Sequence, residues 1–369
     1  MKNTMKIMLA LLTSVSLVSS ATAGELTVTG TAKATMNLIS GGTLGALNNT
    51  GRTLGITNEI DFGATGELDN GMSWKYQVQF DPGASGGSDG VDDTRLELTT
   101  TYGTLGIYVS EGGLDVDNAA SQSVYGRPSD IGLSTGMVDG PGIGGYNNIQ
   151  LHTPAGLLPF DTSVKVAYAP GNDSGLNSGN AKNAGIDDDS FTGSSTEQFQ
   201  IKATPMDGVK VGADYYSRNG GGNAVEKVVQ QYEAGSIFAT YATGPYSVGL
   251  SRTLVAPLIL GSSAALNQTA QSNTGATEGN ASASRQYTNN KMSAAYNVND
   301  ALSVSIEVEK SKREKINDAS QNDIKSQAIQ AAYTMGGMTL SVSHGTTDNV
   351  GYKKDNDVQQ TLFAMAMAF

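Results

Sequence analysis

Cysteine is absent from the 369 residues, histidine occurs only at positions 152 and 344, and tryptophan occurs once. Without cysteine, neither disulfides nor thiolate chemistry can stabilise or operate this chain. A histidine-dependent mechanism would have to use His152 or His344, and Ser343 beside His344 points to the opposite face if both lie on a strand. We therefore interpret His344 as a histidine at a loop end, and the composition gives an enzyme little support.

Basic residues are also scarce, because 23 Lys and Arg stand against 35 Asp and Glu, a net charge of −12. Such an acidic chain is a poor partner for nucleic acid. Beyond the N-terminus, no stretch is continuous and apolar enough for a membrane-spanning helix. If this chain enters a membrane, it enters as strands.

The first residues have the order of an export signal. Lys2 and Lys6 precede the apolar run "IMLALLTSVSLVSS", and Ala21-Thr22-Ala23 follows it. The run is short and interrupted by Thr and Ser, which argues against the alternative of an N-terminal membrane anchor. We expect residues 1–23 to be a cleaved signal peptide and residues 24–369 to form one domain with 21 basic and 35 acidic residues, a net charge of −14.

A period of two runs through nearly the whole mature chain. In residues 26–38 the even positions are mainly apolar and the odd positions are Thr, Lys and Asn. The segments "MSWKYQVQF" and "ALSVSIEVE" alternate in the same way. Alternation of this kind predicts strands with one apolar and one polar face, and we count roughly sixteen of them.

The chain ends on such a strand, "TLFAMAMAF". Phe363, Met365, Met367 and Phe369 lie on one face, with alanines between them. In a soluble sheet a terminal Phe would fray, whereas aromatic rings are favoured at the interface of a lipid bilayer. We therefore expect this face to contact lipid and the last strand to pair with the first, because an open edge in lipid leaves backbone groups unpaired.

The connections between the predicted strands alternate between short turns and long polar loops. Together with the even strand count, this pattern predicts a transmembrane antiparallel β-barrel of about 16 strands. A secreted β-sandwich or adhesin would explain the signal and the alternation. It would not explain why the second face of nearly every strand is rich in Thr, Ser, Gln and Gly.

The segments "TRLELTTTYGTLGIYVSEGG", "YNNIQLHTP" and "VKVAYAPGN", followed by the terminal Phe, resemble the general diffusion porins of Gram-negative outer membranes. The resemblance implies a homotrimer of water-filled barrels that passes ions and small hydrophilic solutes and contacts outer-membrane lipids. It also implies that the barrel-insertion machinery reads the terminal strand as an assembly signal. No cofactor is implied.

In that family the third long loop folds into the lumen and its carboxylates face basic residues of the wall. Here the corresponding segment is 110–145, although the family's Pro-Glu-Phe-Gly motif is absent from it. The resemblance thus implies a pore constriction whose titratable residues are Glu111, Asp115, Asp117, Arg127, Asp130 and Asp139.

Strand parity predicts which charged residues of the wall face the lumen, because they alternate with apolar neighbours. These are Lys33, Lys75, Arg95 and Lys165, together with Glu59, Asp61, Glu67 and Glu97. The excess of acids predicts a modest preference for cations.

Three alternatives stay open from the sequence. A substrate-specific channel would show an aromatic track or a ladder of one charge along the lumen, and a barrel enzyme would need one of the two histidines. The acidic residues 187–189, and the pair Asp115 and Asp117, could hold Ca²⁺. Their spacing is incomplete, so we expect solvated acidic loops and no metal.

Overall fold

The computed structural model describes residues 24–41, 43–44, 47–48, 51–81, 91–131, 134–170, 195–219, 226–262, 265–270, 284–315 and 322–369. The expected signal peptide, residues 1–23, lies outside these ranges, as do the acidic residues 187–189. Within the described chain, no helix is long and apolar enough to cross a bilayer.

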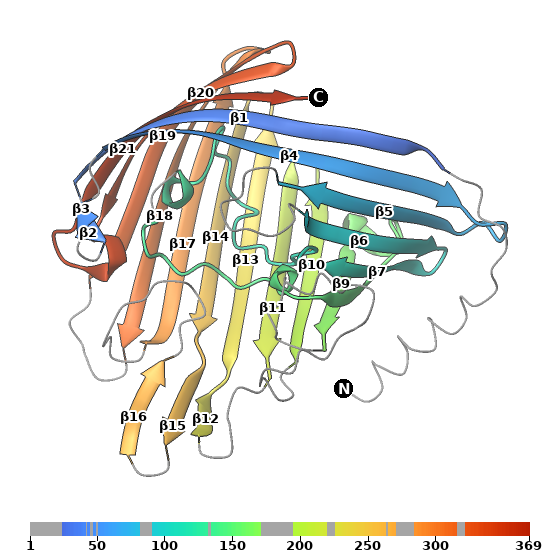
Figure 1. The fold of residues 1–369 in the computed structure, drawn as a ribbon, viewed down its shortest axis with the longest axis horizontal. Coiled ribbons are helices and arrows are strands. Elements are labelled where there is room, and N and C mark those ends of the chain that lie inside the picture. The colour runs from blue at the N-terminus through green and yellow to red at the C-terminus, as the bar shows by residue number, and fades with distance from the viewer. Residues whose placement is uncertain are drawn as a thin grey trace.

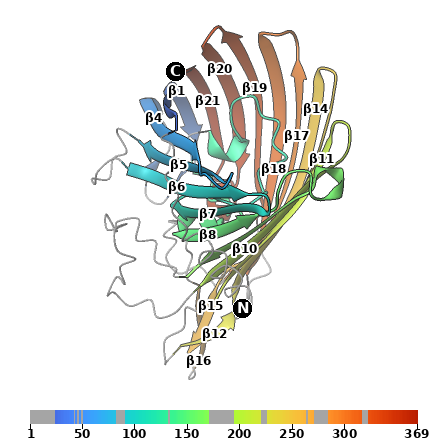
Figure 2. The same cartoon turned by 90° about the vertical axis from the view of Figure 1, so that its right-hand side faces the viewer.

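Sixteen of the strands in the described ranges form a closed antiparallel barrel, as predicted (Figures 1 and 2). In chain order they are β1 (Leu26–Gly41), β4 (Gly51–Glu67), β5 (Ser73–Phe80), β6 (Val91–Thr100), β7 (Gly103–Val109), β8 (Asn148–His152), β9 (Ser163–Ala169), β10 (Thr196–Met206), β11 (Val209–Arg218), β13 (Tyr232–Thr243), β14 (Tyr246–Ala256), β17 (Ser284–Asn297), β18 (Leu302–Lys315), β19 (Ile324–Met335), β20 (Met338–Asp348) and β21 (Val358–Ala368).

The first and last strands close the barrel. β1 pairs with β21 from Thr31↔Ala368 to Gly41↔Val358. At the C-terminus, the Gly30 N–H donates to the Phe369 carbonyl at 2.9 Å and the Phe369 N–H donates to the Gly30 carbonyl at 3.0 Å. The predicted pairing of the last strand with the first is confirmed, and closure satisfies the backbone groups of both edges.

The barrel wall has apolar side chains on its outer face and polar side chains on its inner face, the reverse of a soluble protein. On β18, Ile306 points outward and is 53% exposed, whereas its neighbour Glu307 points inward and is 1% exposed. On β21, Phe363, Met365 and Met367 lie on the outer face, as expected, with 39–48% of each side chain exposed. A belt of exposed apolar side chains around a polar interior is the arrangement that lipid requires.

Connections at one end of the barrel are short and those at the other end are long, as the sequence predicted. The short end includes tight turns at 207–208, 244–245 and 336–337, where Gly208, Gly244 and Gly336 adopt positive φ. Additional short strands form at the long end, and those within 43–48 and 259–270 lie in segments expected to be loop. These are β2 (Thr43–Leu44) and β3 (Leu47–Asn48), which form a two-stranded sheet, and β12 (Glu226–Gln230), β15 (Ile259–Ser262) and β16 (Ala265–Ala270), which form a three-stranded sheet (Figures 1 and 2).

Four short 3₁₀ helices are found in the described residues: η1 (Pro128–Asp130), η2 (Ile143–Gly145), η3 (Pro159–Asp161) and η4 (Val350–Tyr352). The first two belong to the long segment between β7 and β8, residues 110–147, which we call the lumen loop. It crosses the inside of the barrel in front of the strands from β11 to β18 (Figure 1).

Candidate pore constriction

The lumen loop leaves β7 at Ser110, where φ is +61°, and runs along the inward face of the later strands. The Gln200 side-chain amide of β10 donates to the Leu114 carbonyl at 2.7 Å. The Val116 N–H donates to the Asp214 carboxylate of β11 at 3.1 Å. Polar side chains of the wall thus satisfy backbone groups of the loop, which would otherwise be buried without partners.

The loop approaches β14 and β17 most closely near Ala120. A Cβ atom at Gly249 of β14 would lie 1.7 Å from the Ala120 carbonyl oxygen, so only glycine fits at this position. On the next strand, the Ser293 hydroxyl donates to the same carbonyl at 2.8 Å. These contacts fix the distance between the loop backbone and the wall.

A buried ion-pair network connects the loop with β17 and β18. The Lys291 ammonium is 3.4 Å from Asp117, 3.1 Å from Asp139 and 3.8 Å from Glu309. It also donates to the Asn118 side-chain oxygen at 2.5 Å. Because the Lys291 side chain is only 4% exposed, the loop carboxylates compensate its burial.

Arg127 is the second cation of this network and comes from the loop itself. Its guanidinium forms two hydrogen bonds with Asp139, at 3.0 and 3.2 Å, and one with Glu309 at 3.4 Å. Glu309 also accepts a hydrogen bond from the Ser129 N–H at 2.8 Å. Lys291 of β17 and Arg127 of the loop therefore pair with three carboxylates. Glu309 lies on β18, and Asp117 and Asp139 lie in the two halves of the loop.

The two aspartates of the network differ in acidity. Burial raises the pKa of Asp117 to about 6, although Lys291 opposes this. Burial acts on Asp139 as well, but there Lys291 and Arg127 together outweigh it, and the pKa is lowered. Of these two aspartates, Asp117 therefore has the higher pKa.

Further along, the loop is held by β18 and β19. Glu307 accepts hydrogen bonds from the hydroxyls of Ser121 and Ser123, the latter at 2.6 Å. The Gln330 side chain of β19 accepts from the Tyr125 N–H at 3.0 Å. The tip reaches the loop between β20 and β21, where the Gly351 N–H donates to the Thr135 carbonyl at 2.9 Å.

Comparison with known proteins supports the same interpretation of this barrel. A family model described as Gram-negative porin matches residues 9–367. The chain belongs to the Gram-negative porin family. No curated protein matches it significantly.

Several solved structures share the fold of this porin at low sequence identity. OmpT of Vibrio cholerae in a trimer form is 12% identical, with a TM-score of 0.62 over 94% of this chain and 100% of that one. An anion-selective porin from Comamonas acidovorans is 10% identical, with a TM-score of 0.61 over 94% and 100%. Salmonella typhi OmpF in complex with daunomycin is 13% identical, with a TM-score of 0.61 over 94% and 98%.

The porin places its six predicted loop residues in three environments. Asp117, Arg127 and Asp139 lie in the buried network. Glu111 forms an ion pair of 2.9 Å with Arg95 of the wall. Asp115 is half-buried, and the Asp130 side chain is 75% exposed although it lies 3.8 Å from Arg127.

The predicted wall residues all lie on strands between β1 and β9, away from the network. Arg95 donates to Gln77, and Gln77 donates to Asp61 at 2.7 Å, so a polar chain links three strands. The Lys33 ammonium lies 5.8 Å from the centre of the Tyr125 ring of the lumen loop. Of the predicted wall charges, Lys33, Lys75, Arg95, Lys165, Glu59, Asp61 and Glu97 are half-buried, and Glu67 is exposed near the short end.

The sequence prediction omitted Lys291, Glu307 and Glu309, and also Lys202 and Asp214. All five alternate with outward-facing neighbours, so parity alone would have placed them in the lumen. His344 was expected at a loop end but lies within β20, exposed on the outer face, while Ser343 is buried on the lumen face. In the described part of the chain, no group of three or more His, Asp or Glu residues could hold a metal ion.

Proposed function

We propose that this porin is a passive, non-enzymatic channel through which ions and small hydrophilic solutes cross the outer membrane. A closed barrel of sixteen strands is wide enough to leave an aqueous lumen. The observation that carries the proposal is the anchorage of the lumen loop to the wall of β10 to β19, because it narrows the barrel from one side.

Conduction in planar bilayers tests this proposal directly. Purified protein folded in detergent should produce discrete conductance steps without an energy source, and liposomes containing it should swell in solutions of small sugars. Protein that inserts but gives neither signal would refute the channel.

We propose a weak preference for cations. Lys291 and Arg127 are occupied by loop carboxylates and Glu309, so they offer little charge to a passing ion. Of the predicted wall and loop charges outside the network, seven are acids and four are bases, and Lys202 adds a fifth base. The acids are Glu59, Asp61, Glu67, Glu97, Glu111, Asp115 and Asp130, and the bases are Lys33, Lys75, Arg95, Lys165 and Lys202.

Such a small difference predicts a weak field, and salt with a Debye length of about 8 Å screens it further. Reversal potentials under a KCl gradient should show cation preference at low salt that declines as salt rises. An anion-selective wild type would refute this part of the proposal and would align the protein with its relative from Comamonas acidovorans, which is described as anion-selective.

A substrate-specific channel is less well supported by the aromatic residues of the lumen. Tyr216 and Tyr232 face inward and contact each other with ring centres 5.6 Å apart. They are 1% and 8% exposed, packed in a cluster with Leu114 and Ile143 of the lumen loop. We infer that these rings stabilise the loop and do not guide solutes.

We further propose a homotrimer, a state described for one of the structures with this fold. The outer faces of β1 and β4 support it, because they carry very exposed apolar residues: Leu26 at 69%, Leu54 at 82% and Ile56 at 70%. Chemical cross-linking of folded protein should give a trimer band that Ile56→Asn weakens. A cross-linking pattern limited to monomers would refute the trimer.

A further inference from the structure

β1 extends beyond the point where the barrel closes. Its pairing with β21 stops at Gly30, which exchanges two hydrogen bonds with Phe369, whereas its pairing with β4 continues to Leu26↔Ala64. Figure 1 shows β1 and β4 running on past the C-terminus. Residues 26–29 therefore have a strand at one edge, and no strand of the described ranges pairs with the other edge.

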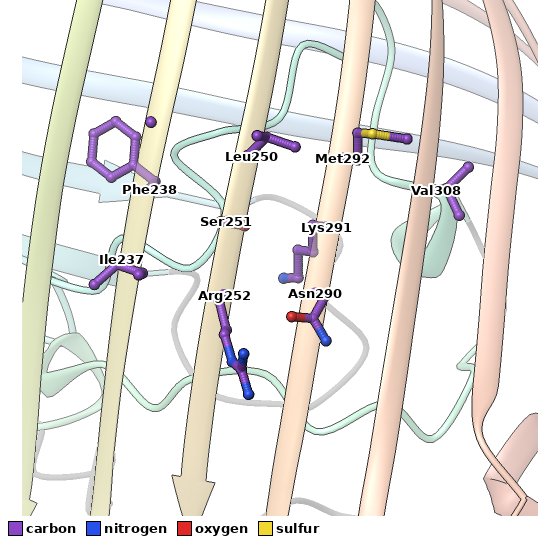
Figure 3. Close-up of a pocket in the computed structure, with 10 residues that line it drawn as sticks. Ile237, Phe238, Leu250, Ser251, Arg252, Asn290, Lys291, Met292 and Val308 are labelled. Atoms are coloured by element: carbon purple, nitrogen blue, oxygen red, sulfur yellow. The ribbon is translucent and has the colours of Figure 1, made fainter.

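Within the barrel a strand normally has a neighbour at each edge. Ser251 of β14, for example, pairs with Phe238 of β13 and with Lys291 of β17 (Figure 3). Residues 24–29 are instead all exposed, on both faces of the strand, and the next residue, Gly30, is buried. Exposure thus changes at the residue where β21 ends.

The open edge of β1 presents unpaired backbone groups. Gly30 directs both its N–H and its C=O to the β21 side, where they bond to Phe369. Alternate residues of an antiparallel strand direct these groups to the same side, so Leu26 and Val28 direct theirs to the open edge. Such an edge is a template for another strand, and residues 24–29 contain none of the lysines or prolines that often protect one.

The open edge lies at the periplasmic end of the barrel. Residues 26–29 belong to the short end, where β4 is followed by the turn 68–72, and short turns of outer-membrane barrels face the periplasm. Unpaired backbone groups are not tolerated in hydrocarbon. We therefore place this edge beyond the acyl chains, where a periplasmic partner can reach it.

The two faces of the projecting strands differ in chemistry. The outer face is apolar, with Leu26 69% and Val28 52% exposed. The lumen face is acidic, because every charged residue within 25–31 and 59–67 is a carboxylate at an odd position. These residues are Glu25, Glu59, Asp61 and Glu67. A strand that fits beside them has apolar residues at every second position and Lys or Arg between them.

A second copy of the chain does not fit this edge. Two barrels in one membrane have parallel axes, and their strands are tilted by about 35–45°. If two copies brought their β1 edges together, these strands would cross at roughly 70–90°, whereas neighbouring strands of a sheet are rotated by only about 20–25°. The partner is therefore a different chain.

We propose that the open edge of β1 binds an extended segment of a periplasmic protein as an additional antiparallel strand, opposite Leu26 and Val28. The backbone of the segment supplies the hydrogen bonds, as in other cases of strand addition. Its apolar side chains continue the row of Leu26 and Val28, and its basic side chains lie on the face of the four carboxylates. The proposal concerns the folded barrel and does not rest on conduction.

A labelled peptide of seven alternating Lys and Val residues, with Lys at both ends, tests this edge. Its binding to folded protein, residues 24–369, is measured in detergent by fluorescence anisotropy. In an antiparallel pair the residues opposite Leu26 and Val28 exchange both backbone hydrogen bonds with them, and the side-chain pattern places valines there. N-methylation of the three valines should weaken binding at least about tenfold, because it removes the donors directed at β1.

The matched control is the same peptide N-methylated at three lysines. Those N–H groups point away from β1, so its binding should stay within about twofold of the unmethylated peptide. The proposal is wrong if the unmethylated peptide does not bind, or if the valine-methylated peptide binds as tightly as the lysine-methylated one. This comparison needs only the wild-type protein.

A substitution at Val28 tests the same edge from the side of the barrel. Val28→Pro removes an N–H at the open edge and leaves the bonds to β4, which the odd residues make. It should weaken binding of the unmethylated peptide about fivefold, whereas Val28→Thr, which keeps the N–H, should stay within about twofold of wild type. Equal binding by the two variants, with both shown to be folded by circular dichroism, would overturn the proposal.

Discussion

Lys291 is the centre of the buried network, so its replacement tests how the lumen loop is held. Lys291→Met keeps an unbranched side chain that is one atom shorter and removes the ammonium from Asp117, Asp139 and Glu309. Asp139 and Glu309 retain Arg127, at 3.0 and 3.4 Å. Asp117 loses its ion pair and keeps the hydrogen bond from the Gly140 N–H at 3.2 Å.

Removing one partner of a buried ion pair is destabilising by about 3–5 kcal/mol. Two features place the expected loss for Lys291→Met near the lower end of this range. Arg127 still compensates two of the three carboxylates, and Asp117 already has a pKa of about 6, so it can take up a proton when Lys291 is gone. We therefore expect the attachment of the loop to weaken by about 3 kcal/mol at pH 7.5, which corresponds to a roughly hundredfold increase in the detached population.

The barrel itself should remain folded, because its backbone ladder does not involve Lys291. Hydrogen exchange measured by mass spectrometry should show faster exchange of the loop amides that are bonded to the wall, such as those of Val116 and Tyr125. Single-channel recordings should show increased open-channel noise. Both effects should be smaller at pH 5, where Asp117 is protonated and no longer needs the cation.

Lys75→Met is the matched control, since it removes one lumen lysine from a half-buried wall position outside the network. It should raise the cation preference, because Lys75 is one of the lumen charges outside the network, while loop exchange and channel noise stay as in wild type. If Lys291→Met left loop exchange unchanged, or if Lys75→Met raised it to the same extent, the network would not be what holds the loop.

Three further predictions concern charge, pH and assembly. Glu59→Gln combined with Asp61→Asn should lower the cation preference measured by reversal potential at low salt, and an unchanged potential would place these acids outside the ion path. Burial raises the pKa of Asp117 above its value in an unfolded chain, so the stabilisation of the attached loop by protonated Asp117 is fully present below about pH 4 and is lost as pH rises through about 6. Protection of the loop amides, expressed relative to the intrinsic exchange rate at each pH, should therefore be greater at pH 5 than at pH 7.5, and Asp117→Asn should flatten this difference. Gly30→Val should impair assembly, because its Cβ would lie 2.6 Å from the Phe369 ring; outer-membrane levels equal to wild type, for this variant or for Phe369→Asp, would refute a role of the terminal ring.

The barrel was predictable because lipid imposes a simple rule on every strand. Apolar residues must face outward and polar residues inward, so parity assigns the face of each side chain without knowledge of its neighbours. The same rule gave the outward face of Phe363 and Met365. It failed for the strands of the long end, β12, β15 and β16, because they lie outside the barrel and their faces are not set by lipid.

Strand parity does not predict which side chains pair with each other inside the lumen. Parity directs Lys291 inward, yet its carboxylate partners Asp117 and Asp139 precede it by 174 and 152 residues. Whether a lumen carboxylate faces the solute or a buried cation depends on where the loop crosses the wall, and that is decided by shape, such as the absence of a side chain at Gly249. Asp117 and Asp130 are therefore equivalent as loop acids in the sequence, but Asp117 is buried against Lys291 and the side chain of Asp130 is 75% exposed. The charge available to an ion in this barrel depends on which acids pair with Lys291 and Arg127 where the loop binds the wall. A count of charges along the chain does not separate these paired acids from the exposed ones.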